Sequence, residues 1–179
     1  MKKVTINLML YALMTIPLFL KAQDNRVNDF FDKYSDNDSY TSVEVQKGLF
    51  ELFATIDSDD RDFDEFQKAI EGIEKLRLVS YSTKNGDDSE KERFYNDIKS
   101  SIPFDNYDEL MIIKKPEARI NFYSKGGGRN IKELLMVVDG DSEVILLSIT
   151  GNIDLKHLAK FGSSMNLDGL DYLSEMDGK

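Results

Sequence analysis

Four short apolar segments typical of β-strands follow one another in the second half of this 179-residue chain, with few residues between them. The connections contain Lys-Lys-Pro-Glu, Lys-Gly-Gly-Gly-Arg and Asp-Gly-Asp, which are turn-forming sequences. Parallel neighbours need a crossover of about a dozen residues or more, and connections this short cannot supply one. The sequence therefore predicts an antiparallel meander of four strands, at residues 110–113, 118–123, 131–138 and 144–149.

The first half of the chain has a different periodicity, because its apolar residues recur three and four positions apart, as on one side of a helix. The sequence predicts helices at residues 27–34, 49–56, 63–73, 94–98 and 155–159, and two further strands at 40–46 and 76–81. We therefore expect an α+β fold. A C-terminal antiparallel meander of four strands and two N-terminal strands pack with about four or five helices.

The N-terminus has the pattern of a secretory signal peptide. Met1-Lys2-Lys3 gives a short cationic start, residues 4–20 are mostly apolar, and the small residue Ala22 precedes a polar stretch. The apolar run is shorter than the ~20 residues of a membrane-spanning helix. It also contains Pro17, which would break such a helix. We expect cleavage after Ala22 rather than a retained N-terminal anchor, and hence export to the periplasm or the exterior.

Removal of residues 1–22 leaves residues 23–179, which we expect to form one α+β domain. Nothing in this stretch repeats, and no linker rich in proline or glycine divides it. The core is predicted at about residues 26–165, followed by a frayed C-terminal tail.

Charge and cysteine content exclude several classes of function. Asp and Glu total 33 against 23 Lys and Arg, which gives a net charge of -10 and argues against nucleic acid or an anionic membrane as a partner. The chain has no cysteine. It therefore has no disulfide, no catalytic thiol and no lipid-bearing cysteine, so it is not a lipoprotein and has no stable membrane anchor after signal cleavage.

An acidic segment between two predicted helices is the one candidate for metal binding. Its oxygen ligands could collect calcium, although neither frame of the segment reproduces an EF-hand loop, because the glycine of the sharp turn is missing. The other interpretation is a solvated helix N-terminus, where carboxylates interact favourably with the helix dipole. The candidate ligands are Asp57, Asp59, Asp60, Asp62 and Asp64.

No assembled catalytic set is visible in the sequence. The single histidine, His157, could act as a general base only with a partner carboxylate, and the sequence does not identify one. We therefore assign no residue to catalysis or to cofactor binding, and weak calcium binding is the only cofactor hypothesis.

The last two predicted strands are apolar on both faces. If Asp139-Gly140 forms a two-residue turn, Met136, Ile145 and Leu147 share one face, which we take as the core. The opposite face lies either under the N-terminal helices or exposed as a partner-binding patch. Its residues are Leu135, Val137, Val144 and Leu146.

Three strings carry a resemblance to a known family: residues 31–34, residues 107–111 and, most specifically, Leu147-Ser148-Ile149-Thr150-Gly151-Asn152-Ile153-Asp154-Leu155. The chain resembles, over roughly residues 26–165, the secreted Bacteroidetes proteins grouped as domain of unknown function 4252. The resemblance implies export in a Gram-negative bacterium, often as a lipoprotein, a form from which this chain departs because it lacks the cysteine. It also implies a link to envelope signalling, because the family's genes often lie near sigma-factor genes. It implies no catalytic or binding residue.

Two classes of function stay open. The favoured one is a non-catalytic binding module of the envelope that binds an unknown protein or polymer. The alternative is a carboxylate-based hydrolase, with or without calcium. A deep pocket with facing carboxylates would support the enzyme, and a shallow surface would support binding.

Overall fold

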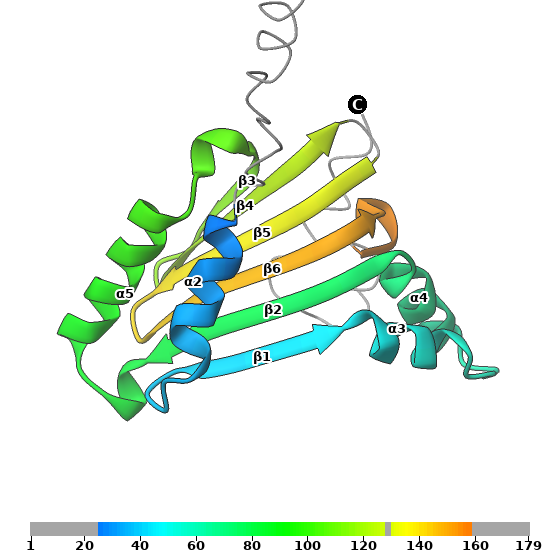
Figure 1. The fold of residues 1–179 in the computed structure, drawn as a ribbon, viewed down its shortest axis with the longest axis horizontal. Coiled ribbons are helices and arrows are strands. Elements are labelled where there is room, and N and C mark those ends of the chain that lie inside the picture. Colours follow the sequence, from blue (N-terminus) through cyan, green and yellow to red (C-terminus); the bar gives the residue numbers. More distant parts are fainter. Residues whose placement is uncertain (1–24, 128–129, 159–179) are drawn as a thin grey trace, which may run out of the picture.

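The computed structural model describes residues 25–127 and 130–158, and they form one six-stranded antiparallel sheet in the order β1-β2-β6-β5-β4-β3 (Figure 1). The strands are β1 (Thr41–Gln46), β2 (Ile73–Ser82), β3 (Asp108–Lys114), β4 (Ala118–Gly127), β5 (Asn130–Gly140) and β6 (Glu143–Ile153). The predicted α+β fold and its C-terminal meander are confirmed. The predicted signal peptide and frayed tail lie outside the described residues.

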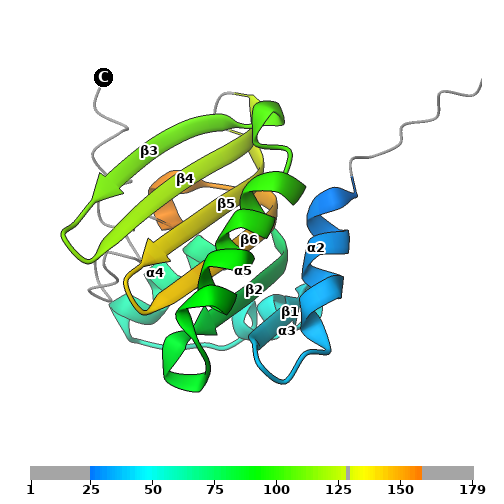
Figure 2. The same cartoon turned by 90° about the vertical axis from the view of Figure 1, so that its left-hand side faces the viewer.

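The helices form two groups on the sheet. They are α2 (Arg26–Ser35), α3 (Lys47–Ala54), α4 (Arg61–Ile70) and α5 (Asp88–Ser101), with short 3-10 turns at η1 (Thr83–Asn85) and η2 (Phe104–Asn106). Figure 2 shows α2 and α5 on the same side of the sheet. Helices α3 and α4 lie at the end where β1 stops and β2 begins (Figure 1).

The turn between β5 and β6 differs from the predicted one. Asp139 pairs with Val144 and Val138 pairs with Ile145, so the two-residue turn at Asp139-Gly140 is wrong. The observed partner of Val138 lies four positions beyond Asp141, the predicted one. Because side chains alternate with a period of two, an even shift keeps every side chain on its predicted face.

Helix α4 ends at Ile70, three residues before the predicted end, because Gly72 has a φ of 83° and turns the chain into β2. The backbone of Gly151 in β6 approaches this turn closely. A Cβ atom built on Gly151 would lie 2.2 Å from the Gly72 carbonyl oxygen, and the φ of Gly151 is 143°. Both positions therefore require glycine.

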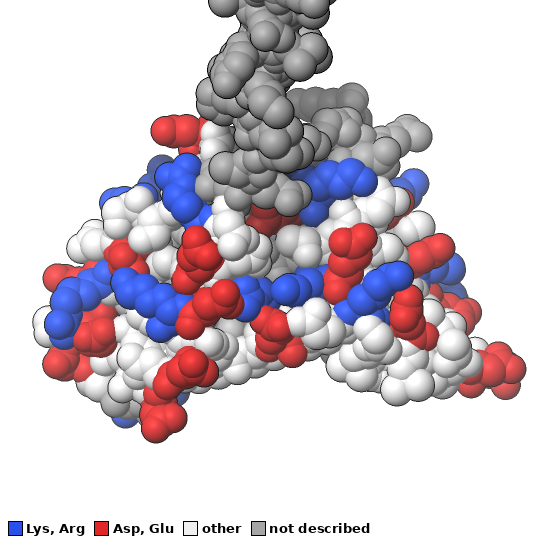
Figure 3. Space-filling model, in the orientation of Figure 1, with Lys and Arg blue, Asp and Glu red and all other residues white. Residues whose placement is uncertain are grey.

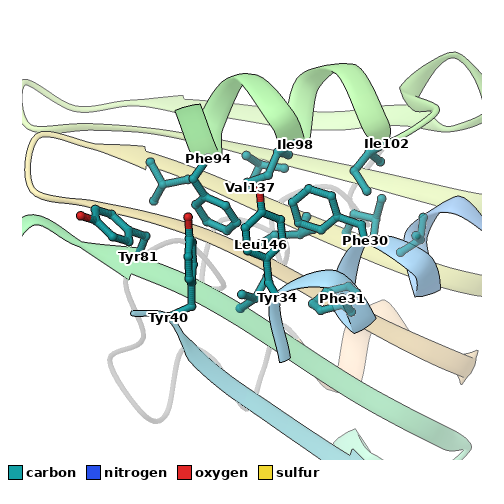
Figure 4. Close-up of a cluster of buried hydrophobic side chains, with 14 residues drawn as sticks. Phe30, Phe31, Tyr34, Tyr40, Tyr81, Phe94, Ile98, Ile102, Val137 and Leu146 are labelled. Atoms are coloured by element: carbon teal, nitrogen blue, oxygen red, sulfur yellow. The ribbon is translucent and has the colours of Figure 1, made fainter. Parts of the chain in front are cut away.

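One half of the core is an aromatic cluster between the sheet and helices α2 and α5 (Figure 4). The Tyr34 ring meets the Phe94 ring edge-on at a centroid distance of 4.9 Å, and Tyr40 lies 5.0 Å from Phe94. Such pairs contribute about 0.5–1.5 kcal/mol each beyond the area that they bury. Because Phe94 is fully buried and comes from α5, these contacts fix both helices to the sheet.

The hydroxyl groups of the cluster reach charged partners at its edge. Tyr34 donates to Asp97 at 2.7 Å, and Lys33 donates to the same carboxylate at 2.8 Å. Burial raises the pKa of Tyr34 far above its usual value, and the hydrogen bond to Asp97 adds to the rise. Burial alone would raise the pKa of Asp97, but the hydrogen bonds from Lys33, Tyr34 and Ser101 outweigh it and hold that pKa below its usual value. The hydrogen bonds from Lys33 and Tyr34 therefore link α2 to α5, and the Asp97 carboxyl group is ionised.

Two glycine-to-alanine substitutions test the backbone contact between β6 and the turn before β2. Gly151→Ala should lower the free energy of unfolding by about 3 kcal/mol or more, because the added Cβ overlaps backbone at a positive φ. Gly48→Ala is the matched control, since nothing lies within 4 Å of its added Cβ in α3, and it should raise stability by up to about 1 kcal/mol. Urea unfolding of both variants measures the difference. Equal stability of the two variants would contradict the contact.

Candidate binding surfaces

The four apolar residues that could have formed a partner patch lie in the core instead. Leu135, Val144 and Leu146 have 0% exposure and Val137 has 6%. They pack in the aromatic cluster beneath α2 and α5. Of the two alternatives, the helix-covered one is therefore found, and a partner surface has to lie elsewhere.

The opposite face of the sheet is covered unevenly. Ile149 and Leu134 are buried under Phe50 of α3 and Ile70 of α4. Farther along the strands Met136, Ile145 and Leu147 are only half-buried. This face therefore holds part of the core, because Leu147 packs against the cluster with Leu134 and Ile149, and Met136 packs against Ile120 and Phe122. The larger buried cluster lies on the other face, beneath α2 and α5.

The acidic segment forms the loop and first turn that lead into α4. Asp60 is the N-cap, and one of its carboxylate oxygens accepts from the Asp62 backbone N–H at 2.9 Å. Asp57, Asp59, Asp62 and Asp64 are also exposed. In the described ranges, no three His, Asp or Glu side chains are grouped so that they could hold a metal ion. The geometry is that of a solvated acidic helix N-terminus.

Exposed apolar side chains gather at one corner of the domain, which we call the β1–α3 edge. It comprises Val43 of edge strand β1, Leu49 and Leu52 of α3, and Ile56 just after α3, and these side chains are between 42% and 59% exposed. Apart from Ile112 in β3, these are the large apolar side chains exposed in the described part of the chain. Figure 3 shows an uncharged surface at the position of α3. Their clustering makes this edge a candidate interaction surface.

The composition of α3 explains why apolar residues remain outside. Phe50 is buried and Phe53 is half-buried, so these two rings already provide the contact of α3 with the sheet and α4. Leu49 and Leu52 lie on the remaining sides of the helix. The helix also carries the exposed ion pair of Lys47 and Glu51, so its outer surface combines this charged pair with two leucines that no described segment buries.

Polar contacts hold β1 in place on its other face. Arg77 of β2 donates from Nε to Glu44 of β1 at 2.6 Å and from Nη1 to the Asn28 side chain at 3.1 Å. It also pairs with Asp32 of α2. The edge strand is therefore fixed to the body of the domain through Glu44, and Val43 on its other face takes no part in these polar contacts.

A second surface feature is a cleft between α5 and β4, with a volume of about 510 Å³. We call it the α5–β4 cleft. Aromatic and charged or amide side chains line it together, and they come from α5, η2, β4 and β5. The main lining residues are Tyr95, Phe104, Arg119, Asn121, Tyr123 and Asp139.

Contacts between neighbouring side chains order this cleft. The rings of Phe104 and Tyr123 stack with centroids 4.6 Å apart. Arg119 donates from Nε to the Asn121 amide oxygen at 3.1 Å. Burial raises the pKa of Tyr95, with a further contribution from Asp139, and burial raises that of Tyr123. Both hydroxyl groups are therefore protonated at neutral pH.

A second cavity, of about 550 Å³, lies beside α3 and is lined in part by the single histidine. A carboxylate oxygen of Asp154 lies 3.6 Å from Nδ1 of His157, so Asp154 is the partner carboxylate that the sequence did not identify. The spacing of three residues within one helical turn is the signal that points to it. Glu51 is also at this cavity, where it pairs with Lys47 at 2.9 Å. Asp154 caps the turn by accepting from the Lys156 backbone N–H at 2.9 Å.

The capping role of Asp60 is tested against its acidic neighbour. Asp60→Ala should lower the free energy of unfolding by about 1 kcal/mol, because it removes the N-cap of α4. Asp59→Ala removes the same charge without a cap and should change stability by less than about 0.5 kcal/mol.

Thermal melting of the wild type with millimolar calcium completes the test, and we expect no shift in the melting temperature. A calcium-dependent rise that both alanine variants lose would instead establish the calcium site.

The comparisons with known proteins give a family and nothing finer. No helix in residues 25–127 and 130–158 has the length and hydropathy to cross a membrane. Searches of curated proteins and of solved structures found no significant match. A family profile, described as domain of unknown function (DUF4252), matches residues 34–161, which include all six strands. The chain therefore belongs to the DUF4252 family, as its sequence strings predict.

Proposed function

We propose that this protein is an exported, non-catalytic binding module of the cell envelope, and that it binds a protein partner along the β1–α3 edge. The observation that carries the proposal is the gathering of Val43, Leu49, Leu52 and Ile56 at one corner. Apolar side chains left in water at one place favour association, because burying them against a partner removes apolar surface from water.

The edge strand itself supports this location. β1 pairs with β2 through six consecutive residue pairs without a bulge, and its sequence has neither proline nor lysine. Such residues and bulges are what normally protect an edge strand from pairing with another chain. The opposite edge, β3, has a register shift between Glu109 and Met111. β1 is therefore the less protected of the two edges.

The charges around the edge favour a basic partner. Between residues 43 and 60 the only cation is Lys47, and it is paired with Glu51. The acidic loop before α4, with Asp57, Asp59 and Asp60, lies in the same stretch, whereas Glu44 is already paired with Arg77. We infer a partner segment that is apolar where it contacts α3 and carries lysine or arginine beside that contact.

The carboxylate arrangement supports binding over hydrolysis. The cavity beside α3 brings Glu51, Glu71 and Asp154 together. A carboxylate pair in a glycosidase needs one carboxyl group in an apolar environment, which keeps it protonated. Glu51 and Asp154 are exposed, and they serve an ion pair and a helix cap.

Export belongs to the proposal because of the sequence of residues 1–22. Expression of the full chain with a C-terminal tag, followed by cell fractionation, should place the protein in the periplasm or the medium. N-terminal sequencing should give a chain that begins at or near Gln23. Intact Met1 in the membrane fraction would refute export.

The partner surface is tested by affinity capture from envelope extracts with the full chain as bait. Leu52→Asp should abolish capture of the proteins that the wild type retains, because it puts an acidic group on the apolar surface. The side chain is 59% exposed, so the melting temperature should hardly change.

Ile112→Asp is the matched control, since it makes the same change at the opposite edge, and it should retain the partners. Capture should also weaken at high salt, because the partner is basic. Identical captured proteins for the wild type and Leu52→Asp would overturn the assignment of this edge.

A further inference from the structure

The α5–β4 cleft lies on the other side of the sheet from α3 and is formed by other elements, so it is independent of the β1–α3 edge. Its volume of about 510 Å³ is within the range of about 300–1,000 Å³ that small-molecule sites occupy. Such sites combine apolar walls with a few placed polar groups, and this cleft has both kinds of lining.

The walls of the cleft are aromatic. Phe104 and Tyr123 stack on each other in a tilted arrangement, and both are half-buried. Tyr95 lines the same cleft from α5. Aromatic faces pack against the C–H groups of a pyranose ring, and the protonated tyrosine hydroxyl groups can donate to its oxygens.

The floor of the cleft holds fixed polar groups. Asn121 is only 8% exposed, and its amide is oriented by two hydrogen bonds, from Arg119 at 3.1 Å and to Glu109 at 3.4 Å. Asp139 supplies a carboxylate acceptor beside Tyr95. Planar amide, guanidinium and carboxylate groups pair with neighbouring hydroxyl groups of a sugar, whereas a purely apolar ligand would leave them without partners.

The charge of the lining is opposite to that of the chain as a whole. The protein has a net charge of -10, yet the side chains that line the cleft include two cations, Lys99 and Arg119, and one carboxylate, Asp139. The neighbouring carboxylate of Glu109 accepts a hydrogen bond from Asn121 and is not part of the lining. The Lys99 ammonium group lies over the Tyr95 ring, 5.2 Å from its centroid. Two cations beside one acid favour a ligand that carries a negative charge.

We propose that the α5–β4 cleft binds a sugar ring that carries a carboxylate, as in a uronic-acid saccharide. The rings of Phe104 and Tyr123 contact the sugar, Asn121 and Asp139 pair with its hydroxyl groups, and Arg119 binds the carboxylate. A guanidinium group can bind a carboxylate through two parallel hydrogen bonds, which gives specificity as well as charge.

The test is binding of three small probes to the full-length protein by isothermal titration and by chemical-shift changes. They are trigalacturonic acid, the neutral trisaccharide maltotriose, and succinate, which carries carboxylates without a sugar. Trigalacturonic acid should bind at least about tenfold more tightly than either of the others. Arg119→Gln should weaken the binding of trigalacturonic acid about tenfold and leave the binding of maltotriose unchanged.

Two further variants separate this site from the proposed partner surface. Leu52→Asp should bind trigalacturonic acid like the wild type. Loss of binding to the protein partner can therefore be distinguished from loss of binding to the saccharide. Lys84→Gln removes an exposed cation in η1, outside the cleft, and should also bind normally.

Three results would overturn the proposal: no binding of trigalacturonic acid at millimolar concentration, equal binding of succinate, or equal binding by Arg119→Gln. Arg119 is exposed, so its substitution should leave the melting temperature nearly unchanged and the binding result can be read directly.

Discussion

The fold depends on covering a sheet whose central strands are apolar on both faces. Leu135 and Leu146 point to one face and have no exposure, while Leu134 and Ile149 point to the other and are also buried. Each face needs its own layer, because a strand of this kind cannot have one side in water. Helices α2 and α5 supply one layer, and α3 and α4 supply part of the other. The two candidate binding surfaces, the β1–α3 edge and the α5–β4 cleft, lie at the borders of these helix layers.

The strands and their faces could be predicted because they depend on local pattern. Short connections require antiparallel neighbours, and alternation places Val137 opposite in direction to Met136 whatever the turn is. The wrong turn at Asp139-Gly140 shifted the predicted pairing by an even number of positions, so each side chain was still assigned to the correct face. Which of the two faces α2 and α5 cover could not be predicted from local sequence pattern. It depends on long-range packing, because both helices are far in sequence from β5 and β6, which they help to cover.

The candidate sites could not be read from the sequence for the same reason. The α5–β4 cleft combines Tyr95, Phe104, Asn121 and Asp139, which come from four elements and share no motif. The β1–α3 edge is contiguous, but its apolar spacing looks the same as that of a buried helix. Only the position of Phe50 against the sheet shows which side of α3 is used and which side, with Leu52, is left exposed.

The string that most specifically carries the family resemblance is explained by folding rather than by binding. Ser148 is buried and donates to Glu133 at 3.2 Å, Gly151 allows the close backbone approach to the turn before β2, and Asp154 caps the turn that follows. A sequence signature made of such residues transfers a fold, and function has to be argued from the sites built on it. The surfaces proposed for binding are formed by other segments, around Leu52 and around Arg119. Two chains that share the signature can therefore have one fold and differ in what they bind.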